Sequence, residues 1–366
     1  MTFTEETAAL ALTRYPGLTQ SQGLAVVRYY GSALAAMEDA SPAEERWARL
    51  SQDKAARLSA YDFAQRQAEW CAETGVRVLP LSHPDYPALL RDCPDPPAVL
   101  YYQGTARLNR RHSLSVVGTR RITDYGKRLC ADLMAGLSAL LPDTLVVSGL
   151  AYGVDIHAHR AALAGGLETV AVLAHGLDRV YPAMHKETAR ALTAHGGLLT
   201  EYPVRTEPDK GNFVRRNRIV AGLSTATLVV ESAGHGGALI TARLAGGYGR
   251  EVMACPGRAG DEYSQGCNEL IRDNKASLVT SAEDILALLG WERAAAPLSA
   301  SGEPQLFPTR TPEEERVLDA LHGTDGLTRD QLALRTGFPV SRLGALLFDL
   351  EMDGAVTKAA GNRYRL

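Results

Sequence analysis

Between about residues 79 and 289, short apolar runs alternate with longer stretches in which apolar residues recur at helical spacing. Near-continuous apolar runs of this kind are typical of strands in a parallel sheet that helices cover on both faces. The pattern therefore predicts an α/β fold class with a Rossmann-like parallel sheet. Its expected strands are Leu114–Val117, Leu145–Ser148, Thr169–Ala174, Gly197–Thr200, Thr227–Glu231 and Glu251–Ala254.

The segments on either side of this region follow other patterns. Residues 1–78 show helical spacing interrupted by a Pro-Gly turn, which predicts a small helical domain similar to a sterile-alpha-motif or helix-hairpin-helix module. Residues 291–308 are rich in Ala, Pro, Ser and Gly and are expected to form a linker. Residues 309–366 predict three helices and a terminal hairpin, an order that resembles a winged helix. The remaining segment, 79–290, is the expected Rossmann-like domain.

Composition and charge narrow the class of protein. The 366 residues are 45% hydrophobic, enough for a full core, and the formal net charge is −3. Any binding of nucleic acid must therefore come from local clusters of basic residues. The five cysteines are an odd number without a Cys-x-x-Cys pair, which argues against a disulfide framework and a structural zinc site. Neither a signal peptide nor a membrane span is indicated, so we expect a cytoplasmic protein.

Turns that carry glycine and arginine give the chemistry of the central domain. They occupy residues 115–121, 147–155, 213–224 and 230–242, next to the expected strands. The turns that follow parallel strands meet at the carboxyl edge of the sheet, where backbone amides and helix N-termini bind anions. Several anion sites along one edge indicate that the ligand is a polyanion.

Two groups of side chains fit such a ligand. Arg120 and Arg121 follow a strand, and a guanidinium group matches a phosphate in a two-pronged geometry. Phe213 stands among cations, an arrangement that suits a single strand because the ring stacks on an exposed base while the cations bind phosphates. Phe213 could equally begin a buried helix, and the small residues of the 148–153 turn could serve only a tight turn.

The central motifs, taken in order, resemble the DprA/Smf DNA-processing family. The resemblance implies a non-catalytic protein that binds single-stranded DNA, forms a homodimer, protects incoming DNA and helps to load the RecA recombinase in natural transformation and recombination. It gives single-strand-binding protein as a further partner, and no cofactor or metal is expected. The motifs that carry the resemblance lie at residues 116–120, 147–159, 176–182, 213–224, 239–242, 252–257 and 266–271.

The family implies that the lysine and the phenylalanine at positions 210 and 213 hold DNA. The sequence departs from the family pattern at Val214, where proline is common, and in the turn Gly234–Gly237. No catalytic residue is expected. The residues expected to bind DNA are Gly118, Thr119, Arg120, Arg121, Ser148, Gly149, Gly153, Lys210, Phe213, Arg216, Asn217, Arg218, Gly236 and Gly237.

Alternatives stay open on the sequence alone. His157 and His159 could be metal ligands, but a helix from Asp155 would place them on different faces and would pair His159 with Asp155 instead. A nucleotide-binding, phosphoribohydrolase-like enzyme is the alternative function, although no acid follows Gly237 in the first two turns of the expected helix to act as general acid or base. The tail carries eight Lys and Arg against nine Asp and Glu, whereas a tail that reads DNA is normally basic. Contact with duplex DNA, packing within the protein and binding of a partner are the alternatives for it.

Overall fold

The computed structural model describes residues 2–39, 45–293, 311–322, 324, 326–352, 355–359 and 363–365. The chain divides into two compact units, residues 1–294 and 295–366, which are described separately. Residues 294–308 of the expected linker lie outside the described residues. None of the described helices is long and apolar enough to cross a membrane.

The first unit opens with helices, as the spacing in residues 1–78 predicts. Thr4 and Thr19 form capping boxes that start the first two helices, and Gly75 ends the long fifth helix in the left-handed conformation. Trp47 is fully buried, and its ring lies 5.0 Å from that of Tyr15; both belong to a core that these helices share with one face of the central sheet. The helices are α1 (Glu5–Thr13), α2 (Gln20–Tyr30), α3 (Ala33–Glu38), α4 (Glu45–Ser51) and α5 (Lys54–Thr74).

A nine-stranded sheet forms the centre of the unit, in the order β1-β2-β6-β5-β4-β3-β7-β8-β9. The strands from β6 to β9 along this order are parallel, and β1 and β2 extend the sheet as antiparallel strands. The strands are β1 (Arg77–Pro80), β2 (Val99–Gly104), β3 (Ser113–Val117), β4 (Leu145–Ser148), β5 (Thr169–Val172), β6 (Gly196–Thr200), β7 (Ala226–Val229), β8 (Glu251–Ala254) and β9 (Ser277–Leu278).

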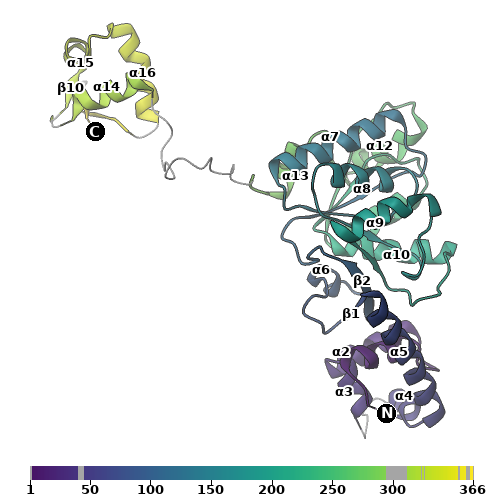
Figure 1. The fold of residues 1–366 in the computed structure, drawn as a ribbon. Coiled ribbons are helices and arrows are strands. Elements are labelled where there is room, and N and C mark those ends of the chain that lie inside the picture. Colours follow the sequence, from purple (N-terminus) through teal and green to yellow (C-terminus); the bar gives the residue numbers. More distant parts are fainter. Residues whose placement is uncertain are drawn as a thin grey trace. The chain divides into compact units, whose positions relative to one another are not determined.

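Helices cover both faces of this sheet (Figure 1). Leu114 and Val116 of β3 belong to the core under α7, α8 and α13, whereas Val117 belongs to the core on the opposite face, which includes α10 and α11. The expected Rossmann-like α/β class is therefore confirmed. The remaining elements of the unit are α6 (Ala88–Arg91), α7 (Asp124–Leu140), α8 (Val154–Ala164), η1 (Ala183–His185), α9 (Lys186–Ala194), α10 (Lys210–Leu223), α11 (Gly237–Gly247), η2 (Glu262–Ser264), α12 (Gln265–Arg272) and α13 (Ala282–Leu289).

The sequence pattern misplaced some strand ends in the central sheet and missed three of its strands. The strand expected over Thr169–Ala174 ends at Val172 in the structure, and the strand expected over Thr227–Glu231 ends at Val229. β1, β2 and β9 were not expected. The predicted division between residues 78 and 79 falls within β1, and the domain boundaries stay predictions.

The second unit has the expected winged-helix order. A capping box at Thr311 starts its first helix, and Leu318, Leu332, Leu346 and Tyr364 belong to a core of its own. Its elements are α14 (Pro312–Leu321), β10 (Leu327–Thr328), α15 (Arg329–Thr336), α16 (Val340–Met352), β11 (Thr357–Ala359) and β12 (Arg363–Arg365), and the strands pair in the order β10-β12-β11.

Candidate nucleic-acid interface

A groove lies at the carboxyl edge of the sheet, where the strand order reverses. From β3 the chain proceeds to β4, β5 and β6 on one side and returns to β7 and β8 on the other. In open α/β sheets, ligands bind in the crevice outside the strands at such a switch point. The groove has a volume of about 1400 Å³ and is lined by the segments that follow β3, β4 and β7 and by the first half of α10.

Glycines bring the segments after β3 and β4 into contact. Gly153 has a φ of +77°, and a Cβ atom there would lie 2.0 Å from the backbone oxygen of Thr119. Val154 N donates a hydrogen bond of 3.1 Å to the same oxygen, and Thr119 N donates one of 2.7 Å to Glu231 O. Gly153 lies below the groove rather than in its wall, and it helps to hold the backbone that carries Arg120.

Three planar side chains from separate segments meet in the groove. The guanidinium carbon of Arg120 lies 5.2 Å from the centre of the Phe213 ring, a cation–π distance. The ring of Tyr181 lies 5.8 Å from the same ring, at an interplanar angle of 52°. Tyr181 is 46% exposed, so the group formed by Arg120, Phe213 and Tyr181 offers flat faces to a ligand.

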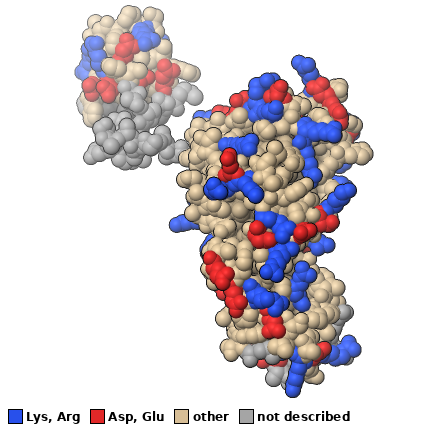
Figure 2. Space-filling model, turned by 45° about the vertical axis from the view of Figure 1, so that its right-hand side comes forward, with Lys and Arg blue, Asp and Glu red and all other residues tan. Residues whose placement is uncertain are grey.

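Basic side chains surround this group. Arg120, Arg121 and Lys210 are exposed, and Lys210, at the start of α10, has no ion-pair partner among the described residues. Arg179 also lines the groove, and it pairs with Asp178 and Glu207. Figure 2 shows Lys and Arg side chains over one face of the larger unit with Asp and Glu side chains among them, so the surface is not uniformly basic. Attraction for an anion therefore depends on the basic side chains at the groove and not on the charge of the whole surface.

The N-terminus of α11, in the groove wall, has a glycine cap. Gly236 precedes α11, which has no side-chain cap, whereas Gly153 caps α8 outside the wall and the Val154 amide is bonded to Thr119 O. Amides of the first turn of such a helix are available to an anion. Gly236 and Gly237 line the groove, and Asn217 Nδ2 donates a 3.4 Å hydrogen bond to Gly237 O, which holds α11 against α10.

Buried polar groups brace the floor of the groove. Arg216 is 4% exposed, and its Nη1 donates to the backbone oxygen of Gly149 at 2.8 Å and to that of Val172. Burial raises the pKa of Asp155, and the charge of Arg216 opposes that rise. Ser148 is fully buried, and its Oγ donates to Val116 O at 2.6 Å. Ser148 therefore supports the strand ends and does not reach the groove.

The structure brings together most of the residues that the sequence singled out, but not Ser148, Gly153 or Arg218. The Arg218 side chain is 11% exposed and contacts Glu201 and Asp95 on the side of α10 away from Phe213. The predicted residues that line the groove are Gly118, Thr119, Arg120, Arg121, Gly149, Lys210, Phe213, Arg216, Asn217, Gly236 and Gly237.

Sequence reasoning did not select several other groove residues. The most informative is Tyr181, because its ring extends the flat surface next to Phe213. Tyr181 lies within the 176–182 motif that carries the family resemblance, so the motif was the signal that could have identified it. The further residues of the groove wall are Arg179, His235, Arg243 and Tyr263.

The histidines on α8 do not form a metal site. His159 is fully buried with Nδ1 2.7 Å from Thr169 Oγ1, and His157 Nδ1 lies 2.8 Å from Gly153 O. No group of three potential ligands occurs in the described part of the chain. The expected pairing of His159 with Asp155 is wrong, because the Asp155 carboxylate accepts a hydrogen bond of 3.4 Å from Ala151 N instead.

Comparison with known proteins identifies this architecture. Residues 77–290 match the model of DNA recombination-mediator protein A, and residues 299–362 match the DprA winged helix domain. The chain belongs to the DNA recombination-mediator protein A family. The match spans the whole groove, from β1 to the end of α13.

Relatives in this family are similar over most of the chain. A putative DNA processing protein DprA from Mycobacterium tuberculosis is 40% identical over 285 residues, which cover 76% of this chain and 71% of the relative. The structure of DprA from Streptococcus pneumoniae matches with a TM-score of 0.66 and 32% identity, over 78% of this chain and 98% of that one. The structure of DNA processing protein A from Helicobacter pylori matches with a TM-score of 0.53 and 29% identity, over 58% of this chain and 95% of the Helicobacter pylori chain. That structure is reported for its single-stranded DNA binding mode.

Proposed function

We propose that the groove binds single-stranded DNA. The observation that carries the proposal is the group of Arg120, Phe213 and Tyr181, which places aromatic faces among cations in the same groove as the glycine-capped N-terminus of α11. Bases stack on such rings with a contribution of roughly 1–3 kcal/mol each, and the cations bind phosphates without reading the sequence. The single-stranded DNA binding mode of the Helicobacter pylori relative supports the same ligand.

We infer that this binding serves recombination. The name of the family supports a mediator of recombination. In this proposal the protein protects incoming DNA during natural transformation and helps to load the RecA recombinase, with single-strand-binding protein as a further partner. The protein acts in this proposal as a cytoplasmic homodimer, without a cofactor and without catalysis. The sequence of α11, which holds no acid, supports binding over cleavage of a nucleotide.

The tail is better suited to a protein partner than to duplex DNA. On α16, Phe348 is 63% exposed, whereas Arg342 is engaged with Glu313. A helix that reads duplex DNA presents basic and amide side chains to the groove of the DNA. This proposal leaves DNA binding to the first unit.

Fluorescence anisotropy with labelled oligothymidine tests the function. The full chain, the double variant Lys210→Ala, Phe213→Ala and the control Tyr29→Leu, an exposed aromatic on α2, are titrated at several salt concentrations. We expect salt-sensitive binding that the double variant loses and the control retains. Binding that is absent from the wild type, or unchanged in the double variant, refutes the proposal. Nucleoside monophosphates as competitors then test the alternative of a nucleotide-binding enzyme.

A further inference from the structure

The helix that carries Lys210 and Phe213 is held by two arginines that point in different directions. Arg216 reaches beneath the sheet edge to the carbonyls of Gly149 and Val172. Arg218 follows Phe213 by five positions, which turns its side chain by about 140° from that of Phe213. It therefore leaves α10 on the side opposite the groove.

Arg218 meets a buried acceptor and a backbone carbonyl. Its Nη2 bonds to Oε2 of Glu201, whose side chain is 2% exposed, just after β6. Its Nη1 donates to the backbone oxygen of Asp95, and its Nε lies 4.0 Å from the Asp95 carboxylate. A guanidinium group fixes direction because its donors lie in one plane. Together with the contacts of Arg216, the two acceptors thus restrict how far α10 can shift or rotate.

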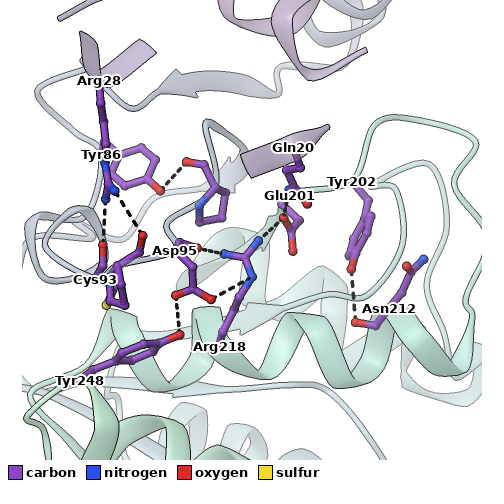
Figure 3. A network of polar contacts seen from close by, with 12 residues as sticks. Gln20, Arg28, Tyr86, Cys93, Asp95, Glu201, Tyr202, Asn212, Arg218 and Tyr248 are labelled. Carbon is purple, nitrogen blue, oxygen red and sulfur yellow. Dashed lines mark hydrogen bonds and ion pairs between the residues drawn. The ribbon is translucent and has the colours of Figure 1, made fainter. Parts of the chain in front are cut away.

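The same acceptors connect Arg218 to other elements, as Figure 3 shows. Gln20, the first residue of α2, donates a 2.7 Å hydrogen bond to Glu201 Oε2. Tyr248, at the end of α11, donates a 2.6 Å hydrogen bond to Asp95 Oδ1. Arg218 is therefore the centre of a network that joins α10 to the N-terminal helices, to the 93–97 loop and to α11.

A second contact of α2 ends on the same loop. Arg28, in the last turn of α2, donates hydrogen bonds of 3.0 and 3.2 Å to the backbone oxygens of Cys93 and Pro94. The loop that receives Arg218 at Asp95 is thus itself held by the N-terminal helices. A shift of this loop would reach α10 through the hydrogen bond from Arg218 Nη1 to Asp95 O. The other partner of Arg218, Glu201, is buried, and that pair tolerates little displacement because an unpaired buried charge is costly.

We propose that Arg218 is a positioning residue for DNA binding: through Glu201 and Asp95 it fixes α10, and with it Phe213 and Lys210, without touching DNA. The proposal rests on the proposed function of the groove. It assigns to the N-terminal helices a part in setting the geometry of the groove, because Gln20 and Arg28 hold the two partners of Arg218 in place.

The salt dependence of oligothymidine binding separates positioning from phosphate contact. For a single strand, the slope of log K against log salt concentration changes by about 0.7 for each phosphate contact that is lost. We expect Arg218→Met to raise Kd roughly fivefold or more, the lower end of what one stacked base contributes, with the slope unchanged. Lys210→Met is expected to reduce the slope, and Arg218→Lys to restore part of the affinity.

Two further proteins control for stability. Arg218→Met combined with Glu201→Gln removes the buried pair together and so avoids an unpaired acid if the single variant does not fold. Leu133→Ala creates a cavity in the core under α7, on the opposite face of the sheet, and is expected to bind DNA as the wild type does. The proposal is overturned if a folded Arg218→Met protein, or the double variant, binds oligothymidine with wild-type affinity. It is also overturned if Arg218→Met reduces the salt slope as much as Lys210→Met does.

Amide hydrogen exchange gives a readout without DNA. We expect Arg218→Met to speed exchange in the first turns of α10 relative to Leu133→Ala at the same temperature. Unchanged exchange there overturns the proposal. A wild-type protein that does not bind oligothymidine refutes the function of the groove, whereas the exchange experiment still decides whether Arg218 positions α10.

Discussion

Gly153 offers a sharp test of how the groove is built, because the chain contains a matched control at the other end of the same helix. Gly153 precedes α8 and Gly166 follows it, with nearly equal φ values of +77° and +78°. A Cβ atom at residue 153 would lie 2.0 Å from Thr119 O, whereas at residue 166 nothing lies within 4 Å. Both Gly→Ala variants place an alanine at a positive φ, but Gly153 has a ψ of −128°, outside the left-handed helical region, and only its Cβ atom meets the backbone of another segment.

The magnitudes follow from these two terms. A left-handed conformation costs an alanine about 1–2 kcal/mol, and we expect Gly166→Ala to lower the free energy of unfolding by that amount. Gly153→Ala adds about 1–3 kcal/mol, because the backbone of Thr119 and Arg120 must move. Displacement of Arg120 also removes a charge-assisted contact worth roughly 1.5–3 kcal/mol, so Kd for oligothymidine is expected to rise about tenfold or more.

Urea unfolding and anisotropy measure the two effects on the same preparations. We expect a lower midpoint for Gly153→Ala than for Gly166→Ala, with weakened DNA binding in the first variant only. Equal midpoints with unchanged binding would refute the contact between the segments after β3 and β4 as the reason for this glycine.

Three further predictions concern the interior and the tail. Burial lowers the pKa of His159 to about 3, so below a pH of about 6.5 the unfolded state binds a proton that the native state does not bind, and stability is lost toward low pH. In urea titrations, His159→Gln should reduce this loss by up to about 1.4 kcal/mol per pH unit. An unchanged dependence of stability on pH would contradict a neutral buried imidazole. All five cysteines are buried, and burial raises the pKa values of Cys71, Cys130 and Cys267 to about 12. Ellman's reagent at pH 8 should therefore label the native protein far more slowly than the protein in urea. Rapid labelling of the native protein would contradict the burial of these thiols. A chain truncated after residue 294 keeps the first compact unit and should bind oligothymidine with the affinity and salt slope of the full chain; a marked loss of affinity would place DNA contacts in the tail.

The parallel strands could be predicted because their residues are buried on both faces. Val146 and Val147 are both fully buried, so β4 appears in the sequence as an uninterrupted apolar run. β2 carries the same signal, because Val99 to Tyr102 form an uninterrupted buried run, and it could have been predicted in the same way. β1 has a weaker signal: it begins with an exposed arginine, ends with a proline and, among the described strands, pairs only with β2.

The sequence predicted which kinds of residue form the candidate site, but not which of them are buried. Arg215, Arg216 and Arg218 look alike in the sequence, yet the first is exposed, the second lies under the sheet edge and the third pairs with Glu201. Helical spacing gives their directions relative to one another, but the acceptors come from the end of β5, from the residues just after β4 and β6, and from the 93–97 loop. Only the fold shows which arginines have partners that occupy their donors.

The preference for single strands that we propose follows from the rings and not from the charge. Arg120, Arg121 and Lys210 can neutralise phosphates of a single strand or of a duplex alike. Phe213 and Tyr181, however, offer faces that only an unstacked base can cover, and in a duplex each base already lies between its neighbours. Replacing Phe213 by leucine should therefore reduce the ratio of single-strand to duplex affinity more than it reduces the salt slope, whereas Lys210→Met should lower both affinities together. The two side chains stand three residues apart on one helix, so a difference between these variants would assign discrimination to the ring and attraction to the cation.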